Sequence, residues 1–595
     1  MSAPHERTTL APSLFAPSLF AYARDLRSAD PGTPLPKSGY PLPDSARPPR
    51  SGRGDRTYNE ALAAVTDVLA SLLAEPEKNR AAAQAPGALA ATGVRHQIAF
   101  SAAADLPLPD DPLDRARTRA LARSLTRDGT TTVSVAAGLG LLTRLGEAED
   151  VPYLRALGLL KGIGQEVVAA LTPLDRSEAA FVWLIHRARG AELLALVAAL
   201  AVGAGNETAA VRDRFLAIPT GPPGLGPEVA RNVAEAVDLT ALLRREPDRP
   251  GLLAQAIRVL VRMVSRRDYE TEIRRHADAV SLYETVAAHV HRLPRELGHR
   301  ADLVSLALDL HSGAGHVLAW PPGRREELLD TLLSVVGEPD DTLSDTSTDP
   351  AGRRRAAWIR RTVRQLRAAR RLPSGAPRFR IEVAVADPGD PDVVETRFLI
   401  DGRPLVPEAF GRGPGESPES LIDSGRLRAT SEPREVRLAE AYCTEGCCGA
   451  LYVTVRRDSD RVVWDGWRRT GGERGLPELS AYRFDAVAYD AEIARAERDQ
   501  SWTWPARHTA RLIAAGLRDR PESLTRWGLR QGWISTEFDV PDTTLVTFTG
   551  PGEEGERRQF LWRIPDDGTP PEAQAAAALR RLDEGDPRGY PELRG

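Results

Sequence analysis

Residues 133–145, VSVAAGLGLLTRL, lead through the acidic turn GEAED at 146–150 into two further apolar patterns at 151–160 and 167–174. In each pattern the apolar residues recur every three or four positions, the spacing of one helix face. Short helices of this kind cannot bury such a face alone, so neighbouring helices must cover it. The segment therefore predicts a stack of short helices joined by tight turns.

The same period extends in both directions along the chain. Residues 58–74, 252–264 and 325–336 repeat it, and the last pattern stops at Gly337, a residue typical of helix ends. The connections are short and contain Gly, Pro, Asp or Asn, as turns do. We therefore expect an α-helical region over residues 56–372.

A helix that ends in Leu-Gly, followed by an acidic turn and a helix that begins with an apolar residue, resembles the HEAT/armadillo class of helical repeats. The resemblance covers roughly residues 132–336. It implies an α-solenoid whose surface binds another protein. The helices show no strict repeat length, so an irregular helical domain remains an alternative.

Residues 1–55 differ from this body. Residues 31–54 are rich in Pro, Gly, Ser and Arg, with too few apolar side chains to form a core, which predicts a mostly disordered leader. The only exact duplication in the chain is here, APSLF at 11–15 and again at 16–20. It is either a short docking motif or a local duplication without a role.

After Pro377 the period changes to two, which is the period of a strand. The expected strands are 379–385, 395–400, 450–456, 461–467, 482–489, 543–548 and 559–564. The expected helices are 491–498, 506–518 and 572–584. We therefore expect an α+β module with a mainly antiparallel sheet over 378–595, so that the chain is multidomain. Seven of the ten tryptophans lie there, which favours an aromatic core.

Length and composition narrow the class of protein. A chain of 595 residues suggests about two to four domains. A net charge of −4 gives no general case for a nucleic acid or an anionic membrane as partner. Three cysteines exclude a disulfide scaffold and fit a reducing cytoplasm. The longest apolar run, 193–204, is shorter than the roughly 20 residues that span a bilayer.

All three cysteines, Cys443, Cys447 and Cys448, fall within six residues of the segment YCTEGCCG. Thiolates are the ligands that zinc and iron–sulfur clusters use. A structural zinc site needs a fourth ligand, for which Glu440 or Glu445 could supply an oxygen. Three interpretations stay open: packing of small side chains in a turn, thiol redox chemistry that includes a disulfide between adjacent cysteines, and a metal site.

The segment 353–371 contains nine arginines and no acidic residue. Such a helix could bind phosphates, and the alternative is a last helix of the array whose charges are offset by the acidic loop before it. The candidate anion-binding residues are Arg353, Arg354, Arg360, Arg361, Arg364 and Arg367.

Six of the ten histidines fall in 276–316, without a His-Glu-x-x-His pattern, and we expect them to be solvated or capping residues. The sequence contains no phosphate-binding loop, dinucleotide fingerprint, nucleophile elbow or kinase motif. We therefore expect a non-enzymatic interaction protein that uses a helical surface to bind another protein. The alternatives are a metal- or thiol-dependent site at the cysteines and nucleic-acid binding through the arginine helix.

Overall fold

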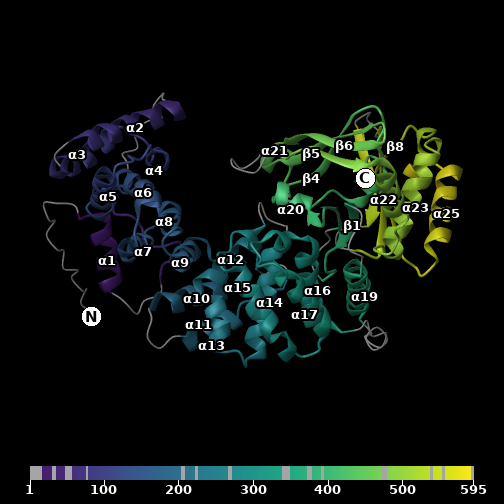
Figure 1. Ribbon diagram of the computed structural model, residues 1–595, viewed down its shortest axis with the longest axis horizontal. Helices are drawn as coiled ribbons and strands as arrows, with labels where there is room; N and C mark the ends of the chain where they lie inside the picture. Colours follow the sequence, from purple (N-terminus) through teal and green to yellow (C-terminus); the bar gives the residue numbers. More distant parts are fainter. Residues whose placement is uncertain are drawn as a thin grey trace, which may run out of the picture. The chain divides into compact units, whose positions relative to one another are not determined.

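The computed structural model describes residues 17–29, 35–46, 57–75, 78–202, 208–221, 225–265, 271–337, 349–371, 378–389, 394–441, 443–471, 479–536, 540–551 and 557–590. The chain forms two compact units, Met1–Ala256 and Ile257–Gly595 (Figure 1). These units differ from the predicted regions 56–372 and 378–595. The predicted limits lie where the sequence periodicity changes, whereas the units are defined by which residues pack against one another.

The described part of the first unit is helical. Its elements are α1 (Leu19–Ala29), η1 (Asp44–Ala46), α2 (Tyr58–Ala74), α3 (Lys78–Ala91), α4 (His96–Ala104), α5 (Pro112–Arg127), α6 (Thr132–Leu145), η2 (Ala148–Asp150), α7 (Val151–Leu157), α8 (Gly164–Leu171), α9 (Arg176–Arg187), α10 (Ala191–Val202), α11 (Thr208–Leu216), α12 (Pro227–Ala236) and α13 (Leu239–Arg245). The helix α14 (Pro250–Val264) crosses the division between the units.

These helices pack in succession. The helices α2, α4, α6, α8, α9 and α12 each contact the next in this row (Figure 1). The centre of the row is α6, which is buried on almost every side. Its two glycines make this possible, because a Cβ at Gly140 would lie 2.4 Å from the carbonyl oxygen of Phe100 in α4, and one at Gly138 would lie 2.8 Å from that of Ala122 in α5.

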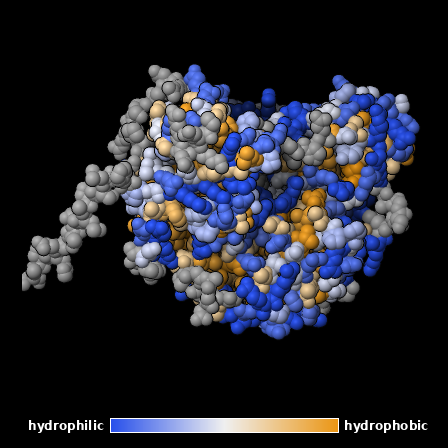
Figure 2. All heavy atoms as spheres, turned by 60° about the vertical axis from the view of Figure 1, so that its left-hand side comes forward, coloured by the Kyte–Doolittle hydropathy of each residue, from blue (hydrophilic) through white to orange (hydrophobic). Residues whose placement is uncertain are grey.

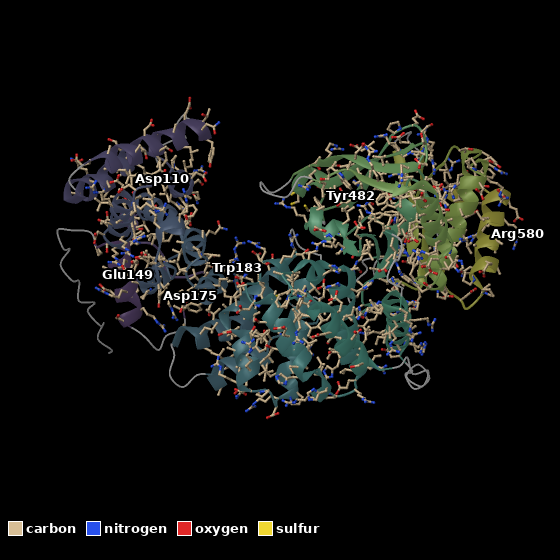
Figure 3. The ribbon with its side chains drawn as sticks, viewed as in Figure 1. Asp110, Glu149, Asp175, Trp183, Tyr482 and Arg580 are labelled. Carbon is tan, nitrogen blue, oxygen red and sulfur yellow. The ribbon has the colours of Figure 1, made fainter. Side chains whose placement is uncertain are left out.

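The helix ends follow from local chemistry. Asp175 accepts a hydrogen bond from the backbone N–H of Glu178 and so caps α9, the helix that carries Trp183 (Figure 3). The helical stretch from Pro227 to Arg245 is divided into α12 and α13, because Asp238 takes a left-handed φ of 46° and caps α13 through the N–H of Ala241.

Part of the predicted disordered leader is ordered. Residues 19–29 form α1, and Leu19 and Ala23 have no exposed surface. Phe20 meets Tyr153 of α7 edge to face at 6.0 Å between ring centroids. The second APSLF copy thus enters an apolar core, which offsets the loss of chain entropy. Residues 1–16, 30–34 and 47–55 lie outside the described part of the chain.

The second unit begins with helices and continues with three antiparallel sheets. Its helices are α15 (Ala279–His289), α16 (Leu297–Ser312), α17 (Arg324–Val336), α19 (Pro350–Arg370), α20 (Leu405–Ala409), α21 (Glu445–Cys448), α22 (Ala486–Arg498), α23 (Pro505–Asp519), α24 (Glu522–Thr525) and α25 (Pro571–Glu584). Short 3-10 or π turns are η3 (Glu272–Arg274), η4 (Val290–Arg292), η5 (Ala314–Val317), η6 (Glu419–Asp423) and η7 (Pro587–Gly589).

The sheets have the orders β1-β2-β3, β4-β5-β6-β7 and β10-β9-β8. The strands are β1 (Phe379–Val385), β2 (Val394–Ile400), β3 (Arg403–Pro404), β4 (Arg434–Glu440), β5 (Ala450–Asp458), β6 (Arg461–Arg469), β7 (Tyr482–Asp485), β8 (Arg530–Thr536), β9 (Thr543–Pro551) and β10 (Arg557–Pro565). A helical body followed by a module of antiparallel sheets is therefore confirmed. The strand expected at 482–489 is shorter, because Asp485 caps α22 through the N–H of Ala488.

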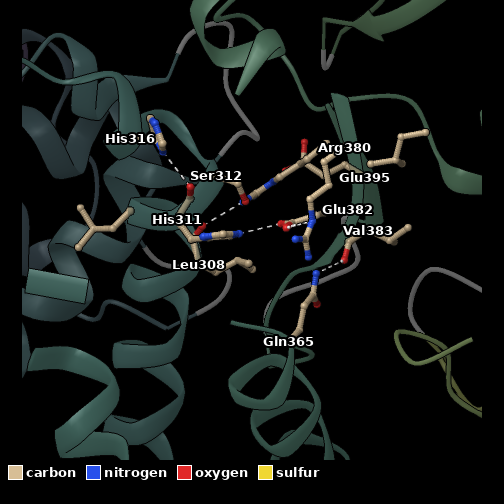
Figure 4. A network of polar contacts seen from close by, with 12 residues as sticks. Leu308, His311, Ser312, His316, Gln365, Arg380, Glu382, Val383 and Glu395 are labelled. Atoms are coloured by element: carbon tan, nitrogen blue, oxygen red, sulfur yellow. Dashed lines mark hydrogen bonds and ion pairs between the residues drawn. The ribbon is translucent and has the colours of Figure 1, made fainter. Parts of the chain in front are cut away.

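A buried polar network joins α16 to the first sheet (Figure 4). His311 Nε2 lies 2.8 Å from Glu382 Oε2 in β1, and Arg380 lies 3.0 Å from the other oxygen. Arg397 in β2 donates to Ser312 Oγ at 2.9 Å. Burial alone would raise the pKa of Glu382, but His311 and the two arginines lower it to about 2. We call these five residues the junction network, and each charge in it meets an opposite charge or a hydrogen-bond partner.

The third sheet forms a smaller core with α23 and α25. Two buried ion pairs fix α23 to η6: Arg507 with Glu419 at 2.8 Å and Arg511 with Asp423 at 2.6 Å. Figure 2 shows a mostly hydrophilic surface with scattered hydrophobic patches. No helix in the described ranges has both the length and the apolar character needed to cross a bilayer.

Candidate metal centre

The three cysteines lie in a single tight turn between β4 and β5. The amides of Cys447 and Cys448 both donate to the carbonyl of Thr444, which winds the segment into α21. Gly449 ends this turn with a φ of +100°, and a Cβ there would lie 1.6 Å from the Thr470 carbonyl oxygen. Only glycine fits this position, so the helical turn and the close approach of residue 470 fix where the cysteines point.

The three sulfur atoms converge. The Sγ atoms of Cys443, Cys447 and Cys448 all lie within 4.8 Å of one another, and those of Cys447 and Cys448 are 3.7 Å apart. Adjacent cysteines on a strand would point to opposite faces. Here they share one side because they belong to a turn. Cys447 is exposed and the other two are half-buried, so the group is accessible from solvent.

Neither neighbouring glutamate joins the sulfurs. Glu440 accepts from the N–H of Glu445 at 2.8 Å and pairs with Arg437 at 3.0 Å. The Glu445 carboxylate accepts from the hydroxyls of Tyr452 at 2.6 Å and Thr470 at 3.1 Å. Both carboxylates therefore hold the turn in shape.

The described part of the chain contains one group of His, Cys, Asp or Glu side chains that could hold a metal ion, and it consists of the three cysteines. His508, the only histidine after residue 316, lies in α23 and is not part of it. For a metal ion at this turn, the described residues would supply three ligands, and a fourth would have to come from solvent or from an external ligand.

The thiols of Cys443 and Cys448 differ in pKa. A hydrogen bond from Cys448 lowers the pKa of Cys443, and the same hydrogen bond raises the pKa of Cys448 to about 12. Cys443 therefore becomes a thiolate, the form that ligates metals, at a lower pH than Cys448.

The arginine helix α19 is largely engaged inside its own unit. Arg354 pairs with Asp542 at 2.5 Å, and Arg367 donates to the carbonyl of Gly337 at 2.8 Å. Arg353 and Arg364 are exposed, whereas Arg360 and Arg361 are half-buried. The candidate residues for nucleic-acid binding thus do not form one exposed basic face, and their contacts add no support to that function.

The histidines of 276–316 are not arranged as a group of metal ligands. His311 belongs to the junction network, and His316 Nδ1 lies 2.8 Å from the His311 carbonyl oxygen. Burial, followed by the charge of Arg325, lowers the pKa of His316 to about 4, so this side chain is neutral at physiological pH.

Comparisons with known proteins give no relative. No protein-family model matches the chain, and neither a curated protein nor a solved structure shows significant similarity to it. Function therefore has to be argued from the site itself.

Proposed function

We propose that this protein binds one soft metal ion, Zn²⁺ in the first place, through the thiolates of Cys443, Cys447 and Cys448. The observation that carries the proposal is the convergence of the three sulfur atoms within 4.8 Å. These are all the cysteines of the chain, and soft thiolates select Zn²⁺ and Cu⁺ over hard cations.

The spacing fits an ion without a large rearrangement. With Zn–S bonds of about 2.3 Å at tetrahedral angles, two ligating sulfurs stand about 3.8 Å apart. The Sγ atoms of Cys447 and Cys448 are separated by 3.7 Å, and no pair exceeds 4.8 Å. Closing the third sulfur onto the ion needs at most about 1 Å of movement, which a rotation about Cα–Cβ provides.

Three protein ligands indicate an open site. A structural zinc site has four protein ligands, whereas a site that keeps one position for water or substrate has three. The exposure of Cys447 supports a fourth position that is open to solvent. The proposed role is therefore metal binding with exchange of an external ligand or transfer of the ion.

Cobalt substitution tests the proposal directly. The full chain, reduced and stripped of metal, is titrated with Co²⁺, whose thiolate charge-transfer and d–d bands report sulfur ligation and tetrahedral geometry. We expect saturation at one equivalent, displacement by Zn²⁺, and about one equivalent of zinc in elemental analysis after dialysis. Cys443→Ser should weaken the charge-transfer band, because two thiolates remain, and should lower the affinity for Co²⁺ at least about tenfold.

The matched control is Asp458→Asn, an exposed substitution at the far end of β5, which should bind Co²⁺ like the wild type. Binding below a tenth of an equivalent would remove the proposal. Thiol titration distinguishes the redox alternative: one free thiol in the oxidised chain and three after reduction would indicate a disulfide between two of the three cysteines. Preferential binding of Cu⁺ would keep the site and change the ion.

A second candidate function is that of a scaffold that binds another protein. The helices of the first unit, stacked as in HEAT-like repeats, would provide the binding surface. The succession of contacts α2, α4, α6, α8, α9 and α12 supports it, because solenoid helices contact mainly their neighbours. Leu194 in α10 and Leu216 in α11 are large apolar side chains that stay 36% exposed. A partner that binds the purified chain in a one-to-one ratio, and binds at least about tenfold more weakly after Leu194→Ser with Leu216→Ser, would support this role. Equal binding by the variant would exclude this surface.

A further inference from the structure

A pocket of about 310 Å³ lies beside the first half of α19, away from the cysteine turn. The end of β1, the start of α23, the residues before β9 and the residue after β10 complete its wall. The volume equals about ten water molecules at about 30 Å³ each, within the range of small-molecule sites. The residues that matter for its chemistry are Trp358, Arg361, Trp504, Pro505, Pro541 and Asp542.

The polar ends of both tryptophans are already bonded. Trp358 Nε1 donates to the carbonyl of Val385 at 2.8 Å, and Trp504 Nε1 donates to that of Pro541 at 2.7 Å. These bonds hold the indoles in place. Trp358 is only 1% exposed, so the half-buried Trp504 offers the larger carbon surface to a ligand. With the rings of Pro505 and Pro541, the indoles give the pocket rigid apolar walls.

The charges that line the pocket are not balanced. Arg353, Arg354 and Arg361 line it together with Asp542 and Asp566. Arg354 is neutralised by Asp542 at 2.5 Å. Asp566 accepts from the N–H of Gly568 in its own loop at 3.0 Å.

Arg361 has no carboxylate or carbonyl partner within the described ranges, although it is half-buried in the pocket wall. Burial lowers the pKa of its guanidinium, and the neighbouring charge of Arg360 lowers it further. A guanidinium remains protonated even so, and a partly buried charge without a counter-ion is costly. Its five N–H donors are therefore available to an anion from outside.

We propose that this pocket binds a small organic anion with a flat apolar body, such as an aromatic carboxylate or sulfonate. The acidic group pairs with Arg361, and the body lies against Trp504, Pro505 and Pro541. The site is separate from the cysteine turn and does not depend on a metal ion.

The test uses anilinonaphthalene sulfonate, a fluorescent aryl anion, with the uncharged phenylnaphthylamine as its neutral analogue. We expect the wild-type chain to bind one equivalent of the sulfonate, at least about tenfold more tightly than the neutral compound. Benzoate should compete with the sulfonate. Arg361→Gln should weaken sulfonate binding about tenfold and leave the neutral compound unchanged.

Arg364→Gln is the matched control, because Arg364 is exposed on the same helix and does not line the pocket. It should bind like the wild type. Arg361→Lys keeps the positive charge but loses the planar guanidinium. Its affinity for the sulfonate should lie between those of the wild type and Arg361→Gln. This variant tests the proposal if Arg361→Gln fails to fold. Equal binding of the two probes, or sulfonate binding that neither Arg361 variant changes, would overturn the proposal.

Discussion

The junction network and the cysteine turn are both polar clusters in the second unit, but only one of them is complete. In the junction network, the His311 imidazole and the Arg380 guanidinium both pair with the carboxylate of Glu382 (Figure 4). Arg397 pairs with Glu395 at 2.7 Å and lowers the pKa of Glu382 through its charge. In the cysteine turn, three sulfurs meet mainly one another at the surface. A cluster whose members satisfy each other holds the fold together, whereas one that converges without an internal counterpart is suited to a ligand.

The largest expected difference between the two clusters is in their contribution to stability. Removal of the carboxylate at the centre of the junction network measures this contribution. Glu382→Gln leaves His311 and Arg380 without their buried anion, whereas Arg397 keeps its ion pair with Glu395. We expect the substitution to lower the free energy of unfolding by about 3–5 kcal/mol. Nine of the ten tryptophans lie in the second unit, so tryptophan fluorescence during urea unfolding measures the effect.

The control for Glu382→Gln is Glu435→Gln, which removes an exposed ion pair with Arg468. It should change the free energy of unfolding by less than about 1 kcal/mol. Equal effects of the two substitutions would contradict the central role given to the junction network.

The cysteine turn should respond to a ligand that the junction network cannot use. Zinc at a hundred times its dissociation constant should raise the free energy of unfolding by about 2.7 kcal/mol if it binds only the folded chain. The same zinc concentration should stabilise Cys443→Ser by at most about 1.4 kcal/mol, the value for a site at least tenfold weaker. A zinc effect that this substitution leaves undiminished would place the ion elsewhere.

Low pH should lower the folding stability of the second unit through His316, whose side chain contacts the backbone of His311 in the junction network. The folded chain holds the pKa of His316 at about 4, against 6.5 in the unfolded chain, so only the unfolded chain gains this proton between those values. Stability therefore falls as pH falls from 6.5 to 4, by on the order of 2 kcal/mol after allowance for partial exposure. Urea unfolding at pH 7 and pH 4.5 measures the change.

His316→Gln should remove that part of the pH dependence. Asp302 works in the opposite direction, because burial raises its pKa to about 6 and acid stabilises its folded form. The difference between the wild type and His316→Gln cancels the contribution of Asp302. Identical pH profiles of the two chains would contradict the assignment to His316.

The smallest expected effect concerns a contact that supports the cysteine turn. Tyr452→Phe removes the hydroxyl that donates to Glu445 at 2.6 Å, while the ring stays beside Arg468. We expect a loss of about 1 kcal/mol in stability and about tenfold in Co²⁺ affinity. Tyr58→Phe, at a residue 58% exposed in the first unit, is the control and should change neither quantity.

Individual helices and strands could be predicted from the sequence, because the residues that determine them lie within a few positions of one another. The bounds predicted for α2 and β1 agree with the structure, and Gly337 ends α17 with a φ of +77°. The strands β4 and β8 were missed, because a shift of register interrupts the alternation in each of them, between Arg437 and Ala439 in β4 and between Gln531 and Ile534 in β8. Their pairing with β5 and β9 gives them their form. The sequence also identified the cysteine cluster, since all three residues fall within six positions.

By itself, the sequence determined the order of helices and strands and the place of the thiols, since periodicity, capping and turn residues act over a few positions. Only the tertiary structure decided which charges are satisfied. His311 and Glu382 are 71 positions apart, and the pocket around Arg361 joins segments from residue 350 to 566. A charge is stabilised by whatever lies across from it in space, and folding, rather than spacing along the chain, brings that neighbour there.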